Sequence, residues 1–294
     1  MTAARPVTPV SARLIDRAPA KVNLTLRVIR RRADGYHELE SLMAFADLAD
    51  TLTFEPGATF ALELRGPFAQ TCGPAADNLV LKAASVLGGK VASLKAGRFI
   101  LEKNIPVAAG LGGGSSDAAA ALRLLARASN LAADDARLFA AARELGADVP
   151  VCLDPKARIM RGLGEILSGA VDLHKFATVL VNPGMALATK DVFAAFKSTS
   201  VGGALPDIPR APEALLALLA DHANDLQPAA ISLKPVIAEV LGALHAMAGC
   251  RLARMSGSGA TCFGLFGSAA EAEAAAKSLR AKHKEWWVHA GTLG

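Results

Sequence analysis

A glycine-rich run at residues 106–118 constrains this chain more than any other segment. Within it, residues 110–116 hold four glycines and two serines, and an alanine-rich helical pattern follows at once. Glycine has no Cβ and reaches positive φ, so this backbone can approach a polyanion closely. The helix that follows would direct its free N–H groups and the positive end of its dipole at the loop, which is typical of a phosphate site. No lysine follows the glycines, so the run is not a P-loop ending in Gly-Lys-Ser/Thr.

Length and charge favour small anionic ligands over nucleic acid. The chain has 294 residues, which suits one large domain or two lobes, and its formal net charge is +5. Its tight basic run, Arg27 with Arg30–Arg32, has no interleaved aromatic residues, and aromatics make up only 5% of the chain. Nucleic-acid binders usually cluster basic residues and interleave aromatics with them. We therefore expect small anionic ligands and no nucleic-acid partner.

Cysteine usage and hydropathy indicate a reducing setting away from membranes. The four cysteines (Cys72, Cys152, Cys250 and Cys262) form no Cys-x-x-Cys pair and lie near no histidine cluster, so we expect neither a zinc site nor a disulfide framework. No apolar run reaches the roughly 18 residues that a membrane span needs. Met1–Asp16 lacks the apolar core of a secretion signal and is expected to be a loose leader. We expect a cytoplasmic protein that is a monomer or a weak homodimer.

Hydrophobic periodicity predicts an α+β chain. Residues 20–28 alternate strictly between apolar and polar side chains, which predicts a half-buried strand. Further strands are expected at 51–65 (interrupted at Pro56-Gly57), 98–103, 177–182 and 261–266, and helices at 78–87, 117–128, 135–145, 213–220, 234–247 and 269–283. Residues 203–213 should form a surface loop. Ser115 or Ser116 should cap the helix at 117–128, and Gly146 should end the helix at 135–145. Strands followed by mixed helices and strands favour two lobes, with a boundary near residue 160.

Three other segments could take part in chemistry, and each has a plain structural alternative. Lys21 lies on the polar face near a strand start, where a solvated lysine is the alternative. Asp148 follows the helix-ending Gly146 and lies close to a proline, where an Asx-turn is the alternative. Residues 255–260 (Met-Ser-Gly-Ser-Gly-Ala) form a second glycine-rich turn that runs directly into a strand, which makes it too compact for a flexible connector.

Taken together, these segments resemble the GHMP kinases, named for galactokinase, homoserine kinase, mevalonate kinase and phosphomevalonate kinase. The resemblance rests on Pro106–Ser116, on Pro-Ala-Lys-x-Asn at 19–23 and on Gly-x-Asp-Val-Pro at 146–150, and it spans Ala18 to about Phe266. It implies an α+β, two-lobed GHMP kinase fold with a ribosomal-protein-S5-like N-terminal lobe, a ferredoxin-like C-terminal lobe and the active site in the cleft between them. The ATP-binding domain is expected at residues 1–160. The C-terminal, substrate-side domain is expected at 161–294, with last residues that could pack back on the N-terminal lobe.

The resemblance also implies roles for single residues in phosphoryl transfer from ATP to an alcohol. Asp148 would be the general base, and Lys21 would keep it ionised and stabilise the developing negative charge. Mg²⁺ is expected with ATP, held mostly by phosphates and water, and no protein ligand is assigned to it, although Ser116 could bind metal or phosphate if it is not merely a cap. The residues expected to bind ATP are Pro106, Val107, Ala108, Ala109, Gly110, Leu111, Gly112, Gly113, Gly114, Ser115, Ser116 and Asn78, and those expected to bind the acceptor are Asn23, Tyr36, His37, Thr189 and Phe193.

One segment narrows the acceptor within the family. Asp-Gly-Tyr-His at 34–37 is similar to the segment with which some GHMP kinases hold a cytosine ring, and residues 224–228 are similar to their Asn-Asp-Leu-Glu-Pro stretch. Gln227 replaces the usual glutamate there, and Val151-Cys152 replace an aromatic pair. The similarity implies an ATP-dependent kinase acting on the 2-hydroxyl of a cytidyl diphosphate sugar alcohol in non-mevalonate isoprenoid synthesis. The alternatives are a homoserine- or mevalonate-type kinase and a non-catalytic nucleotide-binding module.

Overall fold

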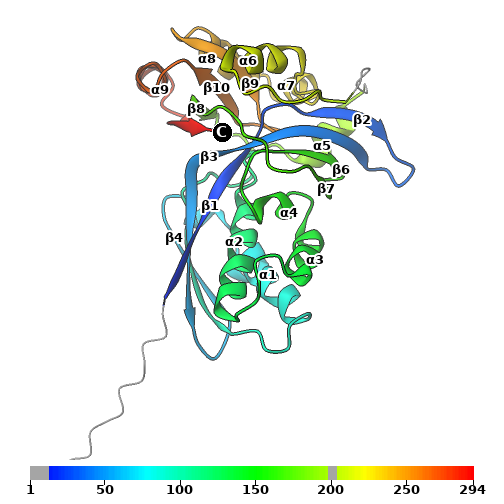
Figure 1. Ribbon diagram of the computed structural model, residues 1–294. Helices are drawn as coiled ribbons and strands as arrows, with labels where there is room; N and C mark the ends of the chain where they lie inside the picture. The colour runs from blue at the N-terminus through cyan, green and yellow to red at the C-terminus, as the bar shows by residue number, and fades with distance from the viewer. Residues whose placement is uncertain (1–12, 198–203) are drawn as a thin grey trace, which may run out of the picture.

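Strand β3 (His37–Pro56) organises the fold because five other strands pair with it. The structure, a computed structural model, describes residues 13–197 and 204–294. β3 is 20 residues long, and Figure 1 shows it running through most of the height of the molecule before it bends over at the top. Its antiparallel partners are β1 (Leu14–Asn23), β2 (Arg27–Arg31), β5 (Gly97–Glu102), β6 (Arg158–Gly162) and β11 (Trp287–Leu293).

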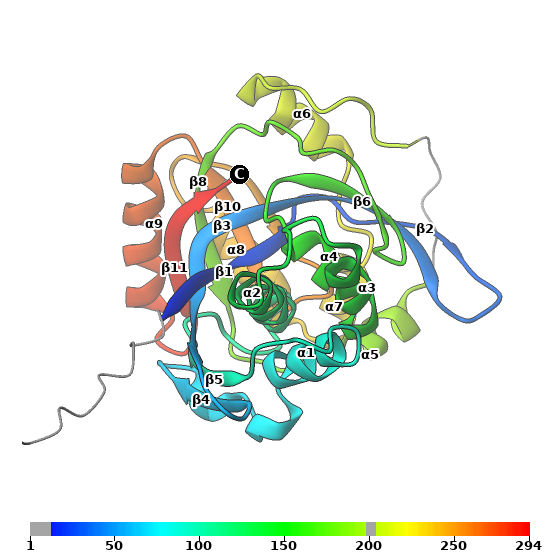
Figure 2. The same ribbon diagram turned by 60° about the horizontal axis from the view of Figure 1, so that its bottom comes forward.

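The lower region in Figure 1 is a sheet with helices on one face. β4 (Ala61–Arg65) runs parallel to β5, and the helices are α1 (Leu79–Gly88), α2 (Gly113–Ala128), α3 (Ala136–Leu145) and α4 (Val149–Cys152), with short 3₁₀ turns at Ala69–Thr71 and Ala75–Asp77. Figure 2 shows α2 almost end-on, beside β1 and β3. Four consecutive buried alanines, Ala118–Ala121, complete one turn of α2, so the helix packs closely against its neighbours on more than one side.

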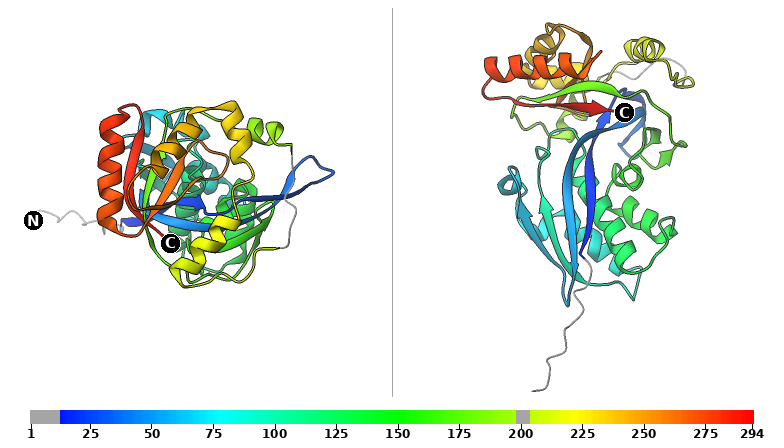
Figure 3. Two further views of the ribbon diagram at one scale, coloured as in Figure 1. Left: turned by 90° about the horizontal axis from the view of Figure 1, so that it is seen from above. Right: turned by 60° about the vertical axis from the view of Figure 1, so that its left-hand side comes forward.

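The upper region is a second antiparallel set of strands. β8 (Phe176–Asn182), β10 (Cys262–Phe266) and β9 (Cys250–Met255) follow one another across the sheet, whose full path is β4-β5-β3-β11-β8-β10-β9. β11 pairs with β8 from Trp287 to Leu293 but meets β3 at one position, Leu293 with Ala46. α8 (Val236–His245) and α9 (Ala269–Lys282) cover one face, as Figure 3 shows. The other elements are β7 (Ile166–Leu167), α5 (Thr189–Ala195), α6 (Pro212–Asp221) and α7 (Gln227–Leu233).

Element boundaries depart from the sequence predictions in several places. The single half-buried strand predicted at 20–28 is divided between β1, which ends at Asn23, and β2, which begins at Arg27, and residues 20–28 are buried on both faces. α2 begins at Gly113, not at 117, and its N-cap is Gly112 with φ of +61°, so the prediction that Ser115 or Ser116 caps it was wrong. β1 already begins at Leu14, so the leader prediction was wrong for residues 14–16; residues 1–12 lie outside the described part of the chain. β3 begins at His37, well before the predicted start at 51. The predicted interruption after Pro56 and the helix end at Gly146 are confirmed.

Two further findings concern the cysteines and the helices of the described residues. All four cysteines are free thiols. Between residues 13 and 197, and from 204 onward, no helix combines the length and apolarity that crossing a bilayer would require.

Candidate active site

Two glycine-rich turns from distant parts of the chain are in direct contact. They are the glycine loop (residues 106–116) and a second turn (residues 256–259). The Ser256 hydroxyl donates to the Gly110 carbonyl at 3.0 Å, and the Thr261 N–H donates to the Ala109 carbonyl at 3.2 Å. Gly110 has φ of +77°, and a Cβ there would lie 2.6 Å from the Gly259 carbonyl oxygen, so glycine alone fits. The second turn is therefore part of a packed site, as its compact sequence predicts.

Lys21 is buried against the glycine loop with its ammonium group directed at two polar partners. Its backbone N–H donates to the Leu111 carbonyl at 2.8 Å, and a Cβ on Gly112 would lie only 2.9 Å from its Cε. Nζ lies 2.8 Å from Asp148 Oδ2 and donates to Asn23 Oδ1 at 3.0 Å. The residue is 5% exposed. The solvated-lysine alternative is therefore wrong, because a buried ammonium group needs partners of this kind.

Asp148 stands at the start of α4 and leaves its carboxylate available. It is the N-cap residue by position, yet its side chain makes no capping hydrogen bond. Within the described chain, no backbone N–H closes an Asx-turn onto it. The side chain is 32% exposed and pairs with Lys21. The geometry thus favours a carboxylate held by a lysine and open to a ligand over a carboxylate used in a turn.

Asn23 is fixed by a chain of hydrogen bonds that the sequence does not reveal. Its Nδ2 donates to Ser41 Oγ at 2.7 Å, and Ser41 Oγ donates in turn to the Thr25 carbonyl. Its backbone N–H donates to Ser256 Oγ at 3.2 Å. With Nδ2 engaged in this way, Oδ1 points at Lys21. Ser256 could be found from its glycine-rich turn, whereas Ser41 carries no sequence signal because it lies in an unremarkable strand.

A cavity of about 1530 Å³ opens beside the Lys21–Asp148 pair. We call it the acceptor cavity. It is lined by every residue that the sequence predicts to bind the acceptor or act in catalysis: Lys21, Asn23, Tyr36, His37, Asp148, Thr189 and Phe193. These residues come from β1, the β2–β3 connection, β3, the start of α4 and α5. The structure therefore brings the predicted acceptor-side residues into one space.

The aromatic end of the acceptor cavity is built by His37 and Phe193. Their ring centroids lie 4.9 Å apart with an interplanar angle of 24°, which is a stacked pair. Burial, and to a smaller degree the nearby Arg31 guanidinium, hold the pKa of His37 below its ordinary value. The Thr189 hydroxyl lies 2.8 Å from the Ser258 hydroxyl of the second turn. Tyr36 is 65% exposed, so it is accessible to a ligand.

A smaller cavity of about 320 Å³ lies along the glycine loop and is lined by Asn78. We call it the nucleotide cavity. Ala108, Gly110, Gly112 and Ser115 line both cavities, so the glycine loop is shared between them. Asn78 caps α1, its Oδ1 accepting from the Val80 N–H at 3.0 Å. A loop placed in this way can present the same backbone to two ligands.

Two family models match the chain. The model described as GHMP kinases N terminal domain matches residues 78–154, and the model described as GHMP kinases C terminal matches residues 204–285. The chain belongs to the GHMP kinase family. The α+β, two-lobed fold expected from the sequence is thereby confirmed, and solved GHMP kinases share it. A homoserine kinase from Cytophaga hutchinsonii superposes with a TM-score of 0.70 at 16% identity, covering 98% of this chain and 97% of that one.

Closer GHMP kinase relatives share one name. A protein of Rhodopseudomonas palustris called 4-diphosphocytidyl-2-C-methyl-D-erythritol kinase is 57% identical, covering 96% of this chain and 95% of its own. One of the same name from Bradyrhizobium diazoefficiens is 54% identical, with 98% and 100% covered. A crystal structure of 4-(cytidine 5'-diphospho)-2C-methyl-D-erythritol kinase matches with a TM-score of 0.79 at 40% identity, over 96% of this chain and 99% of that one.

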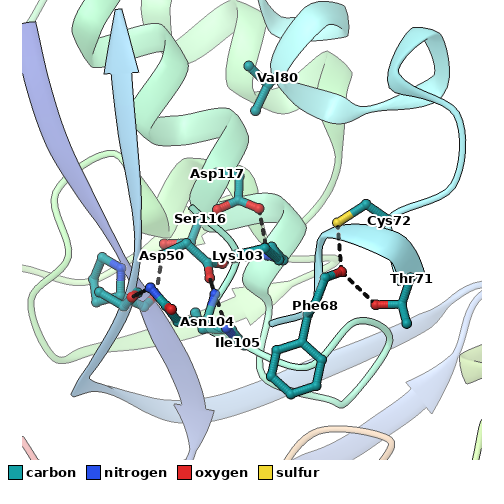
Figure 4. Close-up of polar contacts among 12 residues, drawn as sticks. Asp50, Phe68, Thr71, Cys72, Val80, Lys103, Asn104, Ile105, Ser116 and Asp117 are labelled. Carbon is teal, nitrogen blue, oxygen red and sulfur yellow. Dashed lines mark hydrogen bonds and ion pairs between the residues drawn. The ribbon is translucent and has the colours of Figure 1, made fainter. Parts of the chain in front are cut away.

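This GHMP kinase also carries a buried charge cluster, which the sequence did not predict. Figure 4 shows Lys103, at the end of β5, close to Asp50 of β3 and Asp117 of α2. Lys103 Nζ donates to Asp50 Oδ2 and, at 2.7 Å, to Asp117 Oδ2. Asp50 Oδ1 accepts from the N–H groups of Asn104 and Ile105. The cluster therefore ties the chain entering the glycine loop to the helix that leaves it.

Burial and mutual attraction shape the ionisation of this cluster. Burial raises the pKa of Asp117, the Lys103 ammonium opposes this, and the Asp50 carboxylate adds to it. For Lys103, burial acts to lower the pKa, but the two carboxylates outweigh it, so its pKa lies above the ordinary value. Asp117 Oδ1 is buried without a hydrogen-bond partner in the described chain. Lys103 and Asp117 both line the nucleotide cavity.

Two residues predicted to bind ATP lie outside both cavities. Leu111 is 1% exposed and packs in the core. Ser116 is fully buried, and its hydroxyl donates to the Pro19 carbonyl at 2.8 Å, so the structure does not present it to a metal or a phosphate. Ser115, one residue earlier, lines both cavities. The described residues contain no group of three or more His, Cys, Asp or Glu side chains that could hold a metal ion.

Proposed function

We propose that this chain is an ATP-dependent kinase that phosphorylates the 2-hydroxyl of 4-diphosphocytidyl-2-C-methyl-D-erythritol, giving the 2-phosphate and ADP in non-mevalonate isoprenoid synthesis. The observation that carries the proposal is the Lys21–Asp148 pair, whose charged groups lie 2.8 Å apart in a cavity that also holds the His37–Phe193 stack. The names of relatives that are 51–57% identical over nearly the whole chain support it.

Asp148 is positioned to act as the general base. Its exposed carboxylate takes the proton of the acceptor hydroxyl as the hydroxyl oxygen forms a bond to the γ-phosphorus of ATP. The bond from that phosphorus to the β–γ bridging oxygen breaks, and ADP leaves with the electron pair. Lys21 pairs with Asp148 before the step and stabilises negative charge on the transferred group. Asn23 holds the ammonium group in place through its 3.0 Å hydrogen bond.

The glycine loop and the first turn of α2 would bind the ATP phosphates. α2 has 16 residues, and the N–H groups of its first turn have no partner within the helix, so both they and the helix dipole favour an anion. Mg²⁺ would accompany ATP, held by phosphate oxygens and water, and would neutralise charge on the γ-phosphate. Ser115 is the loop hydroxyl we assign to metal or phosphate, because Ser116 is occupied by Pro19.

The cytosine of the acceptor would lie at the aromatic end of the acceptor cavity. Phe193 would stack on it, contributing about 1–3 kcal/mol, with Tyr36 and His37 beside it. Thr189 would donate from the start of α5. We further propose a cytoplasmic enzyme that is a monomer or a weak homodimer. The domain boundary at residues 160 and 161 stays a prediction.

A coupled assay of ADP release tests the proposed function. The purified protein receives Mg²⁺ and ATP with one of three acceptors: 4-diphosphocytidyl-2-C-methyl-D-erythritol, mevalonate or homoserine. We expect turnover with the first acceptor alone. Turnover of mevalonate or homoserine without the cytidyl compound would replace the proposal by another GHMP kinase activity. No turnover at all, together with salt-sensitive binding of DNA or RNA, would favour the non-catalytic module.

A further inference from the structure

Three cationic side chains line the acceptor cavity without an ion-pair partner in the described chain. Arg31 ends β2, Arg143 lies in the last turn of α3, and Lys190 lies in the first turn of α5. We call them the cationic rim. Two further lining cations differ because they are paired: Arg32 with Asp34 at 3.0 Å, and Lys21 with Asp148 at 2.8 Å. Unpaired positive groups gathered on one cavity create a local field that favours an anion.

The acidic side chains that line the same cavity do not neutralise the rim. Asp148 pairs with Lys21 at 2.8 Å. Glu165 accepts from the Leu163 N–H at 2.6 Å. The described lining therefore has an excess of positively charged side chains.

The rim is distributed along the length that the acceptor must span. Arg31 is paired across the strand ladder with His37, at the aromatic end. Lys190 adjoins Thr189 and lies one helical turn before Phe193. Arg143 lies in the last turn of α3, which leads through Gly146 to Asp148 at the reacting end. An acceptor with a base at one end and an alcohol at the other would place its middle among these three cations.

We propose that Arg31, Arg143 and Lys190 bind the diphosphate of the acceptor and so favour a diphosphate-bearing alcohol over small uncharged ones. This assignment rests on the proposed function, because that acceptor carries two phosphates between its cytidine and its sugar alcohol. Exposed guanidinium and ammonium groups bind phosphate with modest energy each, and the attraction is screened by salt. Their combined effect should therefore be seen in acceptor affinity and not in the chemical step.

Ligand pairs that differ only in phosphate test the rim without any turnover. Binding of CDP and of cytidine to the full chain is measured by calorimetry for the native protein, Arg31→Gln, Arg143→Gln, Lys190→Gln and the triple variant. We expect CDP affinity to fall about three- to tenfold per substitution, and cytidine affinity to stay unchanged. Lys277→Gln on α9 is the matched control, since Lys277 is exposed, lines neither cavity and has no ion pair in the described chain.

Steady-state kinetics separate the acceptor from ATP, whose phosphates offer the same chemistry. The rim predicts a higher KM for the cytidyl acceptor, with kcat and the KM for ATP unchanged. A higher KM for ATP alone would assign the three cations to the donor nucleotide and overturn the proposal. Equal CDP affinity in the native protein and the triple variant would overturn it too.

Two further readouts keep the rim testable in other circumstances. If a variant does not fold, the native protein still tests the rim, because CDP binding should weaken with salt while cytidine binding should not. If the native protein turns over no cytidyl acceptor, the proposed function fails, and a native preference for CDP over cytidine that the triple variant loses would still support the rim.

Discussion

Two sets of lysine and aspartate side chains contact the glycine loop or its flanks, and they differ in how far water and ligands reach them. In the first, Asp148 has 32% of its side chain exposed and pairs with Lys21 beside the acceptor cavity. In the second, the side chains of Lys103, Asp50 and Asp117 are at most 4% exposed. Both sets neutralise charge, but only the first leaves a carboxylate that a hydroxyl can approach.

The hydrogen-bond partners explain this difference. Asp50 accepts from two backbone N–H groups and from Lys103, so its oxygens are committed to the fold. Asp148 accepts no hydrogen bond from the backbone in the described chain and has a single charged partner. The same two residue types thus serve the chemistry in one place and hold the loop in the other, and burial with backbone contacts decides which.

The largest expected effect is on catalysis, from Asp148→Asn. This change keeps the size of the side chain but removes the base, so kcat should fall about 10²–10⁴-fold. The free energy of unfolding should also fall, because the buried ammonium group of Lys21 loses its charged partner, although the asparagine oxygen can still accept a hydrogen bond from it. ADP release measures the first effect and urea unfolding the second.

Asp154→Asn is the matched control for this variant. Asp154 lies close by in the chain and pairs with Lys156 at 3.2 Å and with Arg158 at 2.5 Å, but it lines neither cavity. We expect it to keep full activity. Near-normal turnover by the Asp148→Asn variant would show that this carboxylate is not the general base. The proposed difference between the catalytic pair and the buried cluster would then be wrong.

The next effect is on stability, from Lys103→Met. It leaves two buried carboxylates without their ammonium partner, so the free energy of unfolding should fall by about 3–5 kcal/mol. Adding Asp117→Asn should recover part of the loss, because one uncompensated charge is then removed. Lys277→Met on the exposed face of α9 serves as the control for losing a lysine. The urea midpoints of the three variants measure these changes in stability. A loss of stability in Lys103→Met that is as small as the loss in Lys277→Met would contradict a structural role for the buried cluster.

The local sequence pattern was enough to predict most helices and strands and the Lys21–Asp148 pair, but not the buried cluster around Lys103. Lys21 and Asp148 were found because each lies in a short motif, and their meeting followed from the family resemblance. The buried cluster was missed because Asp117 and Asp50 lie 14 and 53 residues from Lys103 in the sequence, and the three residues share no motif. Nothing local distinguishes Asp50 from an exposed aspartate; its role comes from the pairing of β3 with β5.

The errors in element boundaries have physical causes as well. The glycines at 112–114 suggested a loop, but Gly113 and Gly114 adopt helical geometry because the packing of α2 outweighs their low helix propensity. β3 was shortened in the prediction because residues 40–46 are buried on both faces of the strand, so their sequence does not alternate between apolar and polar side chains. Ser116 was given a ligand role because of its neighbours, whereas its direction toward Pro19 is set by the position of α2 against β1.

The smallest effect concerns His37, at the accessible end of the acceptor cavity. Its pKa should lie below 6.5, and Arg31→Gln should raise it only part of the way back, because burial is the larger cause. The unfolded chain then binds more protons than the folded one, so this group's contribution to stability is lost as pH falls from 6.5 through the lowered value. NMR titration of the imidazole C–H signals measures it, with His37→Gln identifying the resonance. An increase to 6.5 or above in Arg31→Gln would show that charge, not burial, dominates.

The contact between the glycine loop and the second turn makes the site a joint product of two chain segments almost 150 residues apart. The carbonyl of Gly110 and the hydroxyl of Ser256 meet only when both segments are in place. Two fragments separated between residues 167 and 176 would each carry one of these turns, and neither would hold a finished site. Recovery of phosphoryl transfer on mixing such fragments would therefore show that they have reassembled. The enzyme could then serve as a fragment-complementation reporter.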